Sequence, residues 1–317
     1  MLTSFFGKSN PINYLILGAF IVVGYLLGAI SGSSIVITPF LVLDHGFFIV
    51  LNVLIMLLLD FIIRKNHLTK NNTFAILFFT CFLVMLPVIF LQHKILLANA
   101  FLLLALRRIM SLRSDKNSSK KILDASIWIT VASLFYFWSL LFFIPLFIAV
   151  FQKPNTNYKQ ILIPFTGFVA VLIINTAYQL LTNDSLFWFA DWQETISFDF
   201  SKYNSASILV PITVILAFFI WAGVYRFLKL SAIPLKERPN YLLLLYVSIT
   251  ALFVALAGPE KTGAEIVFVL APIAIIATNY IENFETERYV EKDVAEFWFK
   301  EIMLWLVVVL PFVFLFL

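Results

Sequence analysis

The chain has 317 residues, of which 62% are hydrophobic, 17% aromatic and only 13% charged. A soluble domain is usually about half apolar and about one quarter charged, so this composition excludes an ordinary soluble enzyme. The formal net charge of +4 reflects lysines and arginines in loops between apolar segments, and does not indicate a surface that binds nucleic acid.

Long apolar segments follow one another from end to end of the chain. Most contain roughly 18 or more residues, enough for a helix to cross about 30 Å of hydrocarbon. The pattern predicts an all-α fold, a polytopic transmembrane helical bundle. We expect a single integral membrane domain over residues 1–317, because no soluble domain fits between the segments. The segments lie at about 14–33, 46–63, 73–91, 95–110, 122–151, 161–181, 207–226, 241–257, 265–281 and 302–317.

The segment 122–151 is too long for one ordinary span. As a single helix it would measure about 45 Å, well over the ~30 Å hydrocarbon core. Lysine and arginine concentrate in cytoplasmic loops. If 122–151 is a hairpin of two short helices that turns near residues 133–138, only Lys94, Lys202 and Lys261 of the 22 basic residues lie outside. A single crossing would divide the basic residues almost evenly. We therefore predict the hairpin and about 10–11 membrane helices in all.

The predicted cytoplasmic side contains two notable segments. The stretch 107–121 holds six basic residues and one acid, which predicts an anchor with affinity for anionic lipid. The stretch 282–300 mixes charged and aromatic residues and is typical of an interfacial cytoplasmic helix. Two acids at the inner ends of their segments are expected to contact basic loop residues: Asp60 and Asp124, with partners such as Arg64 and Lys121.

Three outer-side residues could carry catalysis. Asp44 and His45 lie together in "LDHGF", and His93 lies in "LQHKI". A carboxylate beside a histidine can act as a general base. We interpret Asp44 as the candidate base, assisted by His45 and His93. The alternative is that short outer loops simply need polar residues to stay in water.

The same outer loops could bind a substrate. Lys94 and Lys261 can offset phosphate charge as point cations, and Glu260 and Glu265 lie beside Lys261 in "GPEKTGAE". Such groups at one membrane surface would suit a lipid-phosphate donor and a hydroxyl acceptor. The aromatic outer loop 182–206 is expected to anchor at the membrane interface, or else to cover an outward cavity.

The sequence lacks the motifs of several classes of enzyme and metal site. The sequence contains no GxxxxGK[ST] phosphate loop, no HExxH zinc helix and no CxxC pair. Its single cysteine, Cys81, excludes a disulfide within the chain. We expect no metal site and no cofactor.

Two resemblances rest on quoted stretches. "LALRRIMSL", "DASIWITVASLFYFWSLLFFI" and "AEIVFVLAPIAIIATNYIE" resemble an uncharacterised family of polytopic inner-membrane proteins from Bacteroidota. The order of "RRIMSLRSDKNSSKK", the hairpin and "EIVFVLAPIAIIATNY" resembles membrane glycosyltransferases of the C superfamily, which use polyprenyl-phosphate sugars at the outer face. The second resemblance implies a glycosyltransferase-C-like architecture. This chain departs from it by lacking a large first outer loop, the arginine before the late span and an outer C-terminal domain.

The leading hypothesis is a multi-pass protein of a bacterial inner membrane that acts on a polyprenyl-linked sugar or lipid at the outer face. Its N-terminus would be cytoplasmic and its C-terminus periplasmic. The first alternative is a non-enzymatic scaffold or assembly subunit of an envelope complex. The second is a small-solute transporter, which would need polar groups near the bilayer midplane. The expected partners are membrane lipids, a polyprenyl-phosphate-linked sugar or an envelope protein complex, and not nucleic acid.

Overall fold

The computed structural model describes residues 1–32, 39–114, 116–153, 156–184, 186–228, 230, 238–259, 261–282 and 294–315. Over these ranges it contains helices and no strands, which confirms the predicted all-α class. Among the described residues, eight helices are long and apolar enough to cross a membrane. They are accompanied by two shorter apolar helical stretches, Phe74–Val84 and Phe137–Phe151. The chain is therefore a multi-pass membrane protein.

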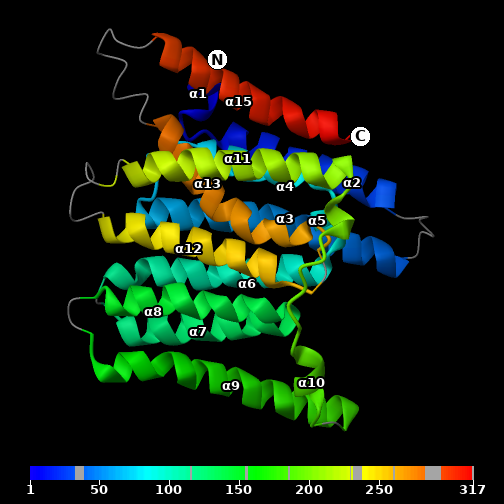
Figure 1. Ribbon diagram of the computed structural model, residues 1–317, viewed down its shortest axis with the longest axis vertical. Helices are drawn as coiled ribbons and strands as arrows, with labels where there is room; N and C mark the ends of the chain where they lie inside the picture. Colours follow the sequence, from blue (N-terminus) through cyan, green and yellow to red (C-terminus); the bar gives the residue numbers. More distant parts are fainter. Residues whose placement is uncertain are drawn as a thin grey trace. The chain divides into compact units, whose positions relative to one another are not determined.

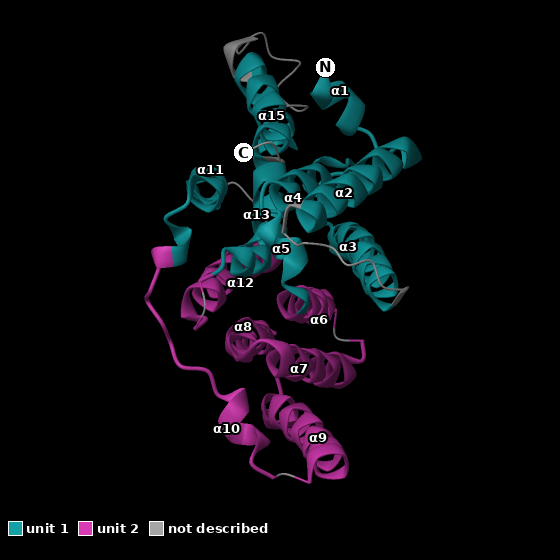
Figure 2. Ribbon diagram, turned by 90° about the vertical axis from the view of Figure 1, so that its right-hand side faces the viewer, with its two compact units in different colours: residues 1–93, 202–233, 262–317 teal, residues 94–201, 234–261 magenta. Residues whose placement is uncertain are grey.

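The chain folds into two compact units, which are coloured separately in Figure 2. Unit 1 consists of residues 1–93, 202–233 and 262–317, and unit 2 consists of residues 94–201 and 234–261. The prediction of one membrane domain is not tested by this division and stays a prediction.

The most buried helices of unit 1 are α4 (Phe74–Val84) and α13 (Val267–Glu282). Nearly every residue of both helices is buried, as expected of helices surrounded by other helices. α13 packs against α4 and α11, and α4 packs against α2, α3 and α15. The remaining elements are α1 (Leu2–Phe6), α2 (Pro11–Gly32), α3 (Pro39–Asn66), α5 (Val88–Leu91), the 3-10 turn η3 (Ser201–Tyr203) at its border, α11 (Ala206–Leu228), the 3-10 turn η5 (Ala264–Ile266) and α15 (Val294–Leu315).

Unit 2 is built around α7 (Ser118–Phe135) and α12 (Arg238–Ala257). α7 packs against α9 and the 3-10 segment η2, and α12 packs against η2 and α8. The α7–α9 contact is close because Gly167 of α9 has no side chain there: an added Cβ would lie 1.9 Å from Ser126 Oγ. The other elements are α6 (His93–Met110), η1 (Ser111–Arg113), η2 (Phe137–Phe142), α8 (Phe143–Phe151), α9 (Tyr158–Asn183) and α10 (Trp188–Trp192).

The predicted hairpin at 122–151 is confirmed. α7 ends at Phe135, Tyr136 has an extended backbone (φ −150°, ψ 104°), and η2 and α8 then return. In Figure 1, α7 and α8 lie side by side, and the hairpin begins and ends at the same, left-hand end of unit 2. The first arm is longer than expected, because the polar residues 118–121 extend the helix beyond the apolar segment. Tyr136 is 6% exposed and its Oη donates to Val254 O of α12 at 3.1 Å, so this residue of the turn contacts protein, as a turn at membrane depth requires.

The predicted contacts of the two inner acids are confirmed in one case and differ in the other. Asp60 Oδ2 lies 2.6 Å from Arg64 Nε, as expected. Asp124 instead pairs with Arg108, at 2.7 Å. The ammonium of Lys121 donates to the carbonyl oxygens of Ser111 and Ser114.

The predicted interfacial helix over about 282–300 falls largely outside the described residues. Glu282 is the last residue of α13, and residues 283–293 are not among those described. Residues 294–300 form the beginning of α15 and continue directly into the last apolar stretch.

The part of the aromatic loop that belongs to unit 2 packs against helices of that unit. Trp188 Nε1 donates to Thr176 Oγ1 of α9 at 3.2 Å, and Trp192 Nε1 donates to Ser133 O of α7 at 2.7 Å. A tryptophan with its indole N–H engaged by protein is fixed in place. Parts of this loop therefore belong to the helix packing of the unit, while its anchoring at a membrane interface stays a prediction.

Replacing Gly258 with alanine is expected to lower the free energy of unfolding by about 2 kcal/mol. A Cβ there would lie 2.1 Å from Tyr136 Oη, and would displace the hydroxyl that bonds to Val254 O. Gly223→Ala is the matched control, because no atom lies within 4 Å of its added Cβ; in a helix interior it should stabilise by about 0.5–1 kcal/mol. Denaturation in detergent would measure both, and equal values for the two variants would contradict the role of Tyr136.

Candidate functional site

The candidate site is a cluster of polar and aromatic side chains in unit 1. Asp44, His45 and Phe48 come from the beginning of α3, Tyr25 comes from α2, and His93 is the first residue of α6. Asp44 and Phe48 are four residues apart on one helix and so lie on the same face. The basic residues of α3, in contrast, are in its last turn. The cluster is therefore at the end of α3 opposite to those basic residues.

His93 is held by two contacts. Its Nδ1 lies 3.4 Å from Asp44 Oδ2, and its ring stacks on Phe48 with centroids 3.6 Å apart and planes inclined by 17°. The carboxylate and the ring together fix the orientation of the imidazole. Both partners of the pair are partly open to solvent: 32% of the His93 side chain and 39% of the Asp44 side chain are exposed.

His45 is oriented by a buried tyrosine. A hydrogen bond of 2.8 Å joins Tyr25 Oη and His45 Nδ1, and Tyr25 is only 1% exposed. The ring centroids of His45 and His93 are 6.5 Å apart. The three predicted catalytic residues, Asp44, His45 and His93, are thus brought together, whereas their catalytic role stays a prediction.

In chemical terms, His93 is arranged like a general base whose ring is oriented by a carboxylate. A carboxylate on one ring nitrogen of a histidine fixes the ring and stabilises its protonated form, which leaves the other nitrogen for a substrate. An exposed ion pair contributes little to folding, about 0–1 kcal/mol. Stability therefore does not explain why Asp44 and His93 are aligned.

The predicted substrate-binding residues have different surroundings, and their shared role stays a prediction. Glu260 lies outside the described residues. Lys94 is exposed in unit 2, directly after His93 in the chain. Also in unit 2, burial raises the pKa of the Glu194 carboxyl, and the positive charge of Lys94 partly counteracts that rise. Lys94 is therefore close enough to influence the partly buried carboxyl of Glu194.

Lys261 has a structural role at the end of α12. It is 1% exposed, and its ammonium donates to the carbonyl oxygens of Leu256 and, at 2.8 Å, Gly258. It also lies 5.6 Å from the centroid of the Phe200 ring. A cation at the carbonyl end of a helix satisfies unpaired acceptors and favours the helix dipole. Lys261 thus caps the end of α12, and its predicted phosphate contact is untested.

Glu265 is completely buried in unit 1. It accepts hydrogen bonds from Thr262 Oγ1 at 3.0 Å and from Tyr203 Oη at 3.3 Å. Burial raises the pKa of the Tyr203 hydroxyl, and the nearby Glu265 carboxylate raises it further. Tyr203 therefore stays protonated as a donor to this acid.

Sequence reasoning missed two members of the cluster, Tyr25 and Phe48. Tyr25 lies in an apolar segment, where the only signal is that a buried tyrosine hydroxyl needs a hydrogen-bond partner. For Phe48 the sequence offers only one indication, its position four residues after Asp44 on the same helix. No group of three or more His, Cys, Asp or Glu side chains that could hold a metal ion occurs in the described part of the chain.

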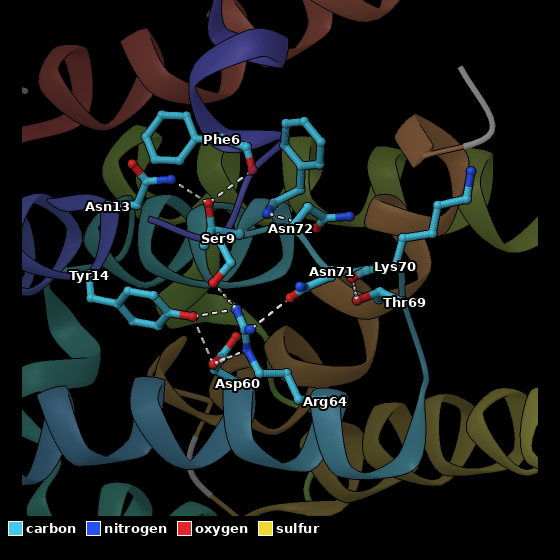
Figure 3. A network of polar contacts seen from close by, with 12 residues as sticks. Phe6, Ser9, Asn13, Tyr14, Asp60, Arg64, Thr69, Lys70, Asn71 and Asn72 are labelled. Carbon is cyan, nitrogen blue, oxygen red and sulfur yellow. Dashed lines mark hydrogen bonds and ion pairs between the residues drawn. The ribbon is translucent and has the colours of Figure 1, made fainter. Parts of the chain in front are cut away.

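A second polar network, also missed, lies at the basic end of unit 1 (Figure 3). Arg64 Nε bonds to Asp60 Oδ2, and its two terminal nitrogens bond to Asn71 Oδ1 at 2.8 Å, Ser9 Oγ at 2.8 Å and Tyr14 Oη. Tyr14 Oη also donates to Asp60 at 2.9 Å. The guanidinium thereby connects the start of α2, the end of α3 and the loop after α3. We interpret this network as one that stabilises the fold.

The comparisons with known proteins give one family. No curated protein and no solved structure matches, so neither comparison supports the resemblance to glycosyltransferases of the C superfamily or an origin in Bacteroidota. The model of a family of unknown function, DUF6427, matches residues 31–317. This confirms the predicted resemblance to an uncharacterised family. The chain is a multi-pass membrane protein that belongs to DUF6427, a family of unknown function.

Proposed function

We propose that this protein is a membrane enzyme that transfers the sugar of a polyprenyl-phosphate-linked donor to a hydroxyl acceptor at the outer face of a bacterial inner membrane. The observation that carries the proposal is the 3.4 Å contact of Asp44 Oδ2 with His93 Nδ1, two side chains that are partly open to solvent. The proposed topology has a cytoplasmic N-terminus and a periplasmic C-terminus, since the basic residues of α3 are in the turn farthest from Asp44.

In the proposed reaction the acceptor hydroxyl attacks the anomeric carbon of the donor. The bond between that carbon and the phosphate oxygen breaks, and polyprenyl phosphate leaves with the electron pair. His93 Nε2 takes the proton of the hydroxyl, while Asp44 stabilises the imidazolium through Nδ1. His45, which is hydrogen-bonded to Tyr25, lies beside the ring of His93 and assists it.

The leaving phosphate needs a cation. Lys94 follows His93 in the chain and is exposed, so we assign it this role. Lys261 is left out of the proposed site because its ammonium is held by the carbonyls at the end of α12.

The test is to reconstitute the full chain in liposomes with a set of polyprenyl-phosphate sugars. Mass spectrometry would detect released polyprenyl phosphate, a product that is the same for every sugar. We expect release that depends on the protein and increases when glycan or alcohol acceptors are added. Release no greater than in protein-free liposomes, together with a stoichiometric partner after mild detergent extraction, would contradict the enzyme and favour the scaffold.

A further inference from the structure

A compact group of cations lies at the turn between α6 and α7 in unit 2. Arg113, Lys116 and Lys120 are all exposed and fall within eight residues of sequence. We call these three residues the basic turn. They belong neither to the helix core nor to the proposed catalytic cluster.

A neighbouring lysine connects the two sides of the basic turn. Lys121 Nζ donates to Ser111 O at 2.7 Å, Ser114 O at 3.0 Å and Ser114 Oγ at 2.6 Å. Ser111 Oγ in turn donates to Arg108 O at 2.9 Å. Lys121 therefore links the first turn of α7, which carries Lys120, to Ser111 and Ser114, which flank Arg113.

The charge around the turn is strongly positive. The stretch 107–121 contains six basic residues and one acid, Asp115, which lies outside the described residues. The next acid along the chain, Asp124, pairs with Arg108 at 2.7 Å. An anionic ligand would thus meet an excess of positive charge here.

The position of the turn identifies the ligand class. The candidate span His93–Arg113 ends in it, and the candidate span Tyr158–Asn183 begins beside it, because Gln160 Nε2 donates to Ser118 Oγ at 3.0 Å. In Figure 1, the end of α6 and the beginnings of α7 and α9 lie at the same end of unit 2. Phe151 and Tyr158, at this end, are 61% and 68% exposed, as is typical of side chains at the boundary of a bilayer. The ends of two spans are the level at which phospholipid headgroups lie.

We propose that the basic turn binds the headgroups of anionic phospholipids. Each lysine or arginine near an acidic bilayer surface contributes to such binding, and three exposed cations here lie within eight residues of sequence. This inference is independent of the proposed enzyme activity.

The test compares full-length wild type with the triple variant R113Q/K116Q/K120Q. Native mass spectrometry of the detergent-solubilised protein would count retained phosphatidylglycerol and phosphatidylcholine of equal chain length. We expect wild type to prefer phosphatidylglycerol, and the triple variant to bind it about a hundredfold more weakly. The preference should also decline as salt is raised, since exposed charges are screened.

The matched control removes three exposed cations elsewhere, in K8Q/K65Q/K202Q. It changes the net charge equally and should keep the preference for phosphatidylglycerol within about twofold of wild type. The proposal is overturned if the control loses as much of the preference for phosphatidylglycerol as the triple variant does. It is also overturned if wild type retains both lipids equally. Binding of a short RNA at the turn by a protein without lipid preference would likewise overturn it. Equal melting temperatures of all three proteins would show that each is folded.

Discussion

Replacing Asp44 with asparagine is expected to lower the rate of polyprenyl phosphate release by about 10²–10⁴-fold. Asparagine keeps the size of the side chain but removes the negative charge that stabilises protonated His93. His93→Gln should have an effect of similar size, since it removes the group that takes the proton. The double variant should release polyprenyl phosphate at about the same rate as the slower of the two single variants, because the two residues act as a unit.

The melting temperature should not change in Asp44→Asn, whereas His93→Gln also loses the ring contact with Phe48 and should lower it slightly. The pair is 3.4 Å apart with both side chains about one third exposed, and such a pair contributes about 0–1 kcal/mol to stability. The matched controls are Asp184→Asn and His67→Asn, which change the same residue types at exposed positions. Both positions have positive φ, which asparagine tolerates well. A normal rate in D44N, or an equal loss of rate in D184N, would remove Asp44 from the proposed mechanism.

The hairpin was predictable because two independent signals agreed. Its length exceeded one span, and the charge asymmetry of the loops required an even number of crossings over 122–151. The start of α7 at Ser118 was not predictable from hydropathy, because the residues from Ser118 to Lys121 are polar and still helical. Hydropathy marks the part of a helix that is in hydrocarbon, whereas hydrogen bonds decide where the helix begins.

The candidate site was predictable only in its titratable residues. Asp44 and His93 could be grouped because both were assigned to outer loops. Tyr25 could not be added, because a tyrosine in an apolar segment looks the same whether its hydroxyl meets a histidine or a carbonyl. The role of Lys261 was also hidden: its ammonium returns to the end of α12, and a cap of this kind depends on the path of the loop rather than on residue type.

The second large effect is expected at Arg64. Arg64→Met should lower the free energy of unfolding by about 2–3 kcal/mol. The guanidinium bonds to Asp60, Asn71, Ser9 and Tyr14 (Figure 3). Methionine keeps part of the apolar stem but makes none of these bonds. Asp60, only 13% exposed, would keep its charge with Tyr14 as its remaining contact in the network.

The size of this loss follows from burial. Breaking a fully buried ion pair costs about 3–5 kcal/mol, because one charge is left without compensation. Arg64 is 35% exposed, so solvent screens part of the interaction and the expected value is lower. Asp60→Asn should cost less than Arg64→Met, since an amide can still accept a hydrogen bond from Tyr14.

Lys65→Met provides the matched control, because it makes the same change in charge at the next residue of α3. Lys65 is exposed, and its described contact is with the ring of Phe61, 5.5 Å from Nζ to the centroid. Such a contact contributes about 0.5 kcal/mol at an exposed site. Reversible unfolding in mixed detergent micelles would measure both variants. If R64M and K65M are equally stable, the polar network does not lock the start of α2 to the end of α3, and the stability of unit 1 rests on its apolar helices α4 and α13 alone.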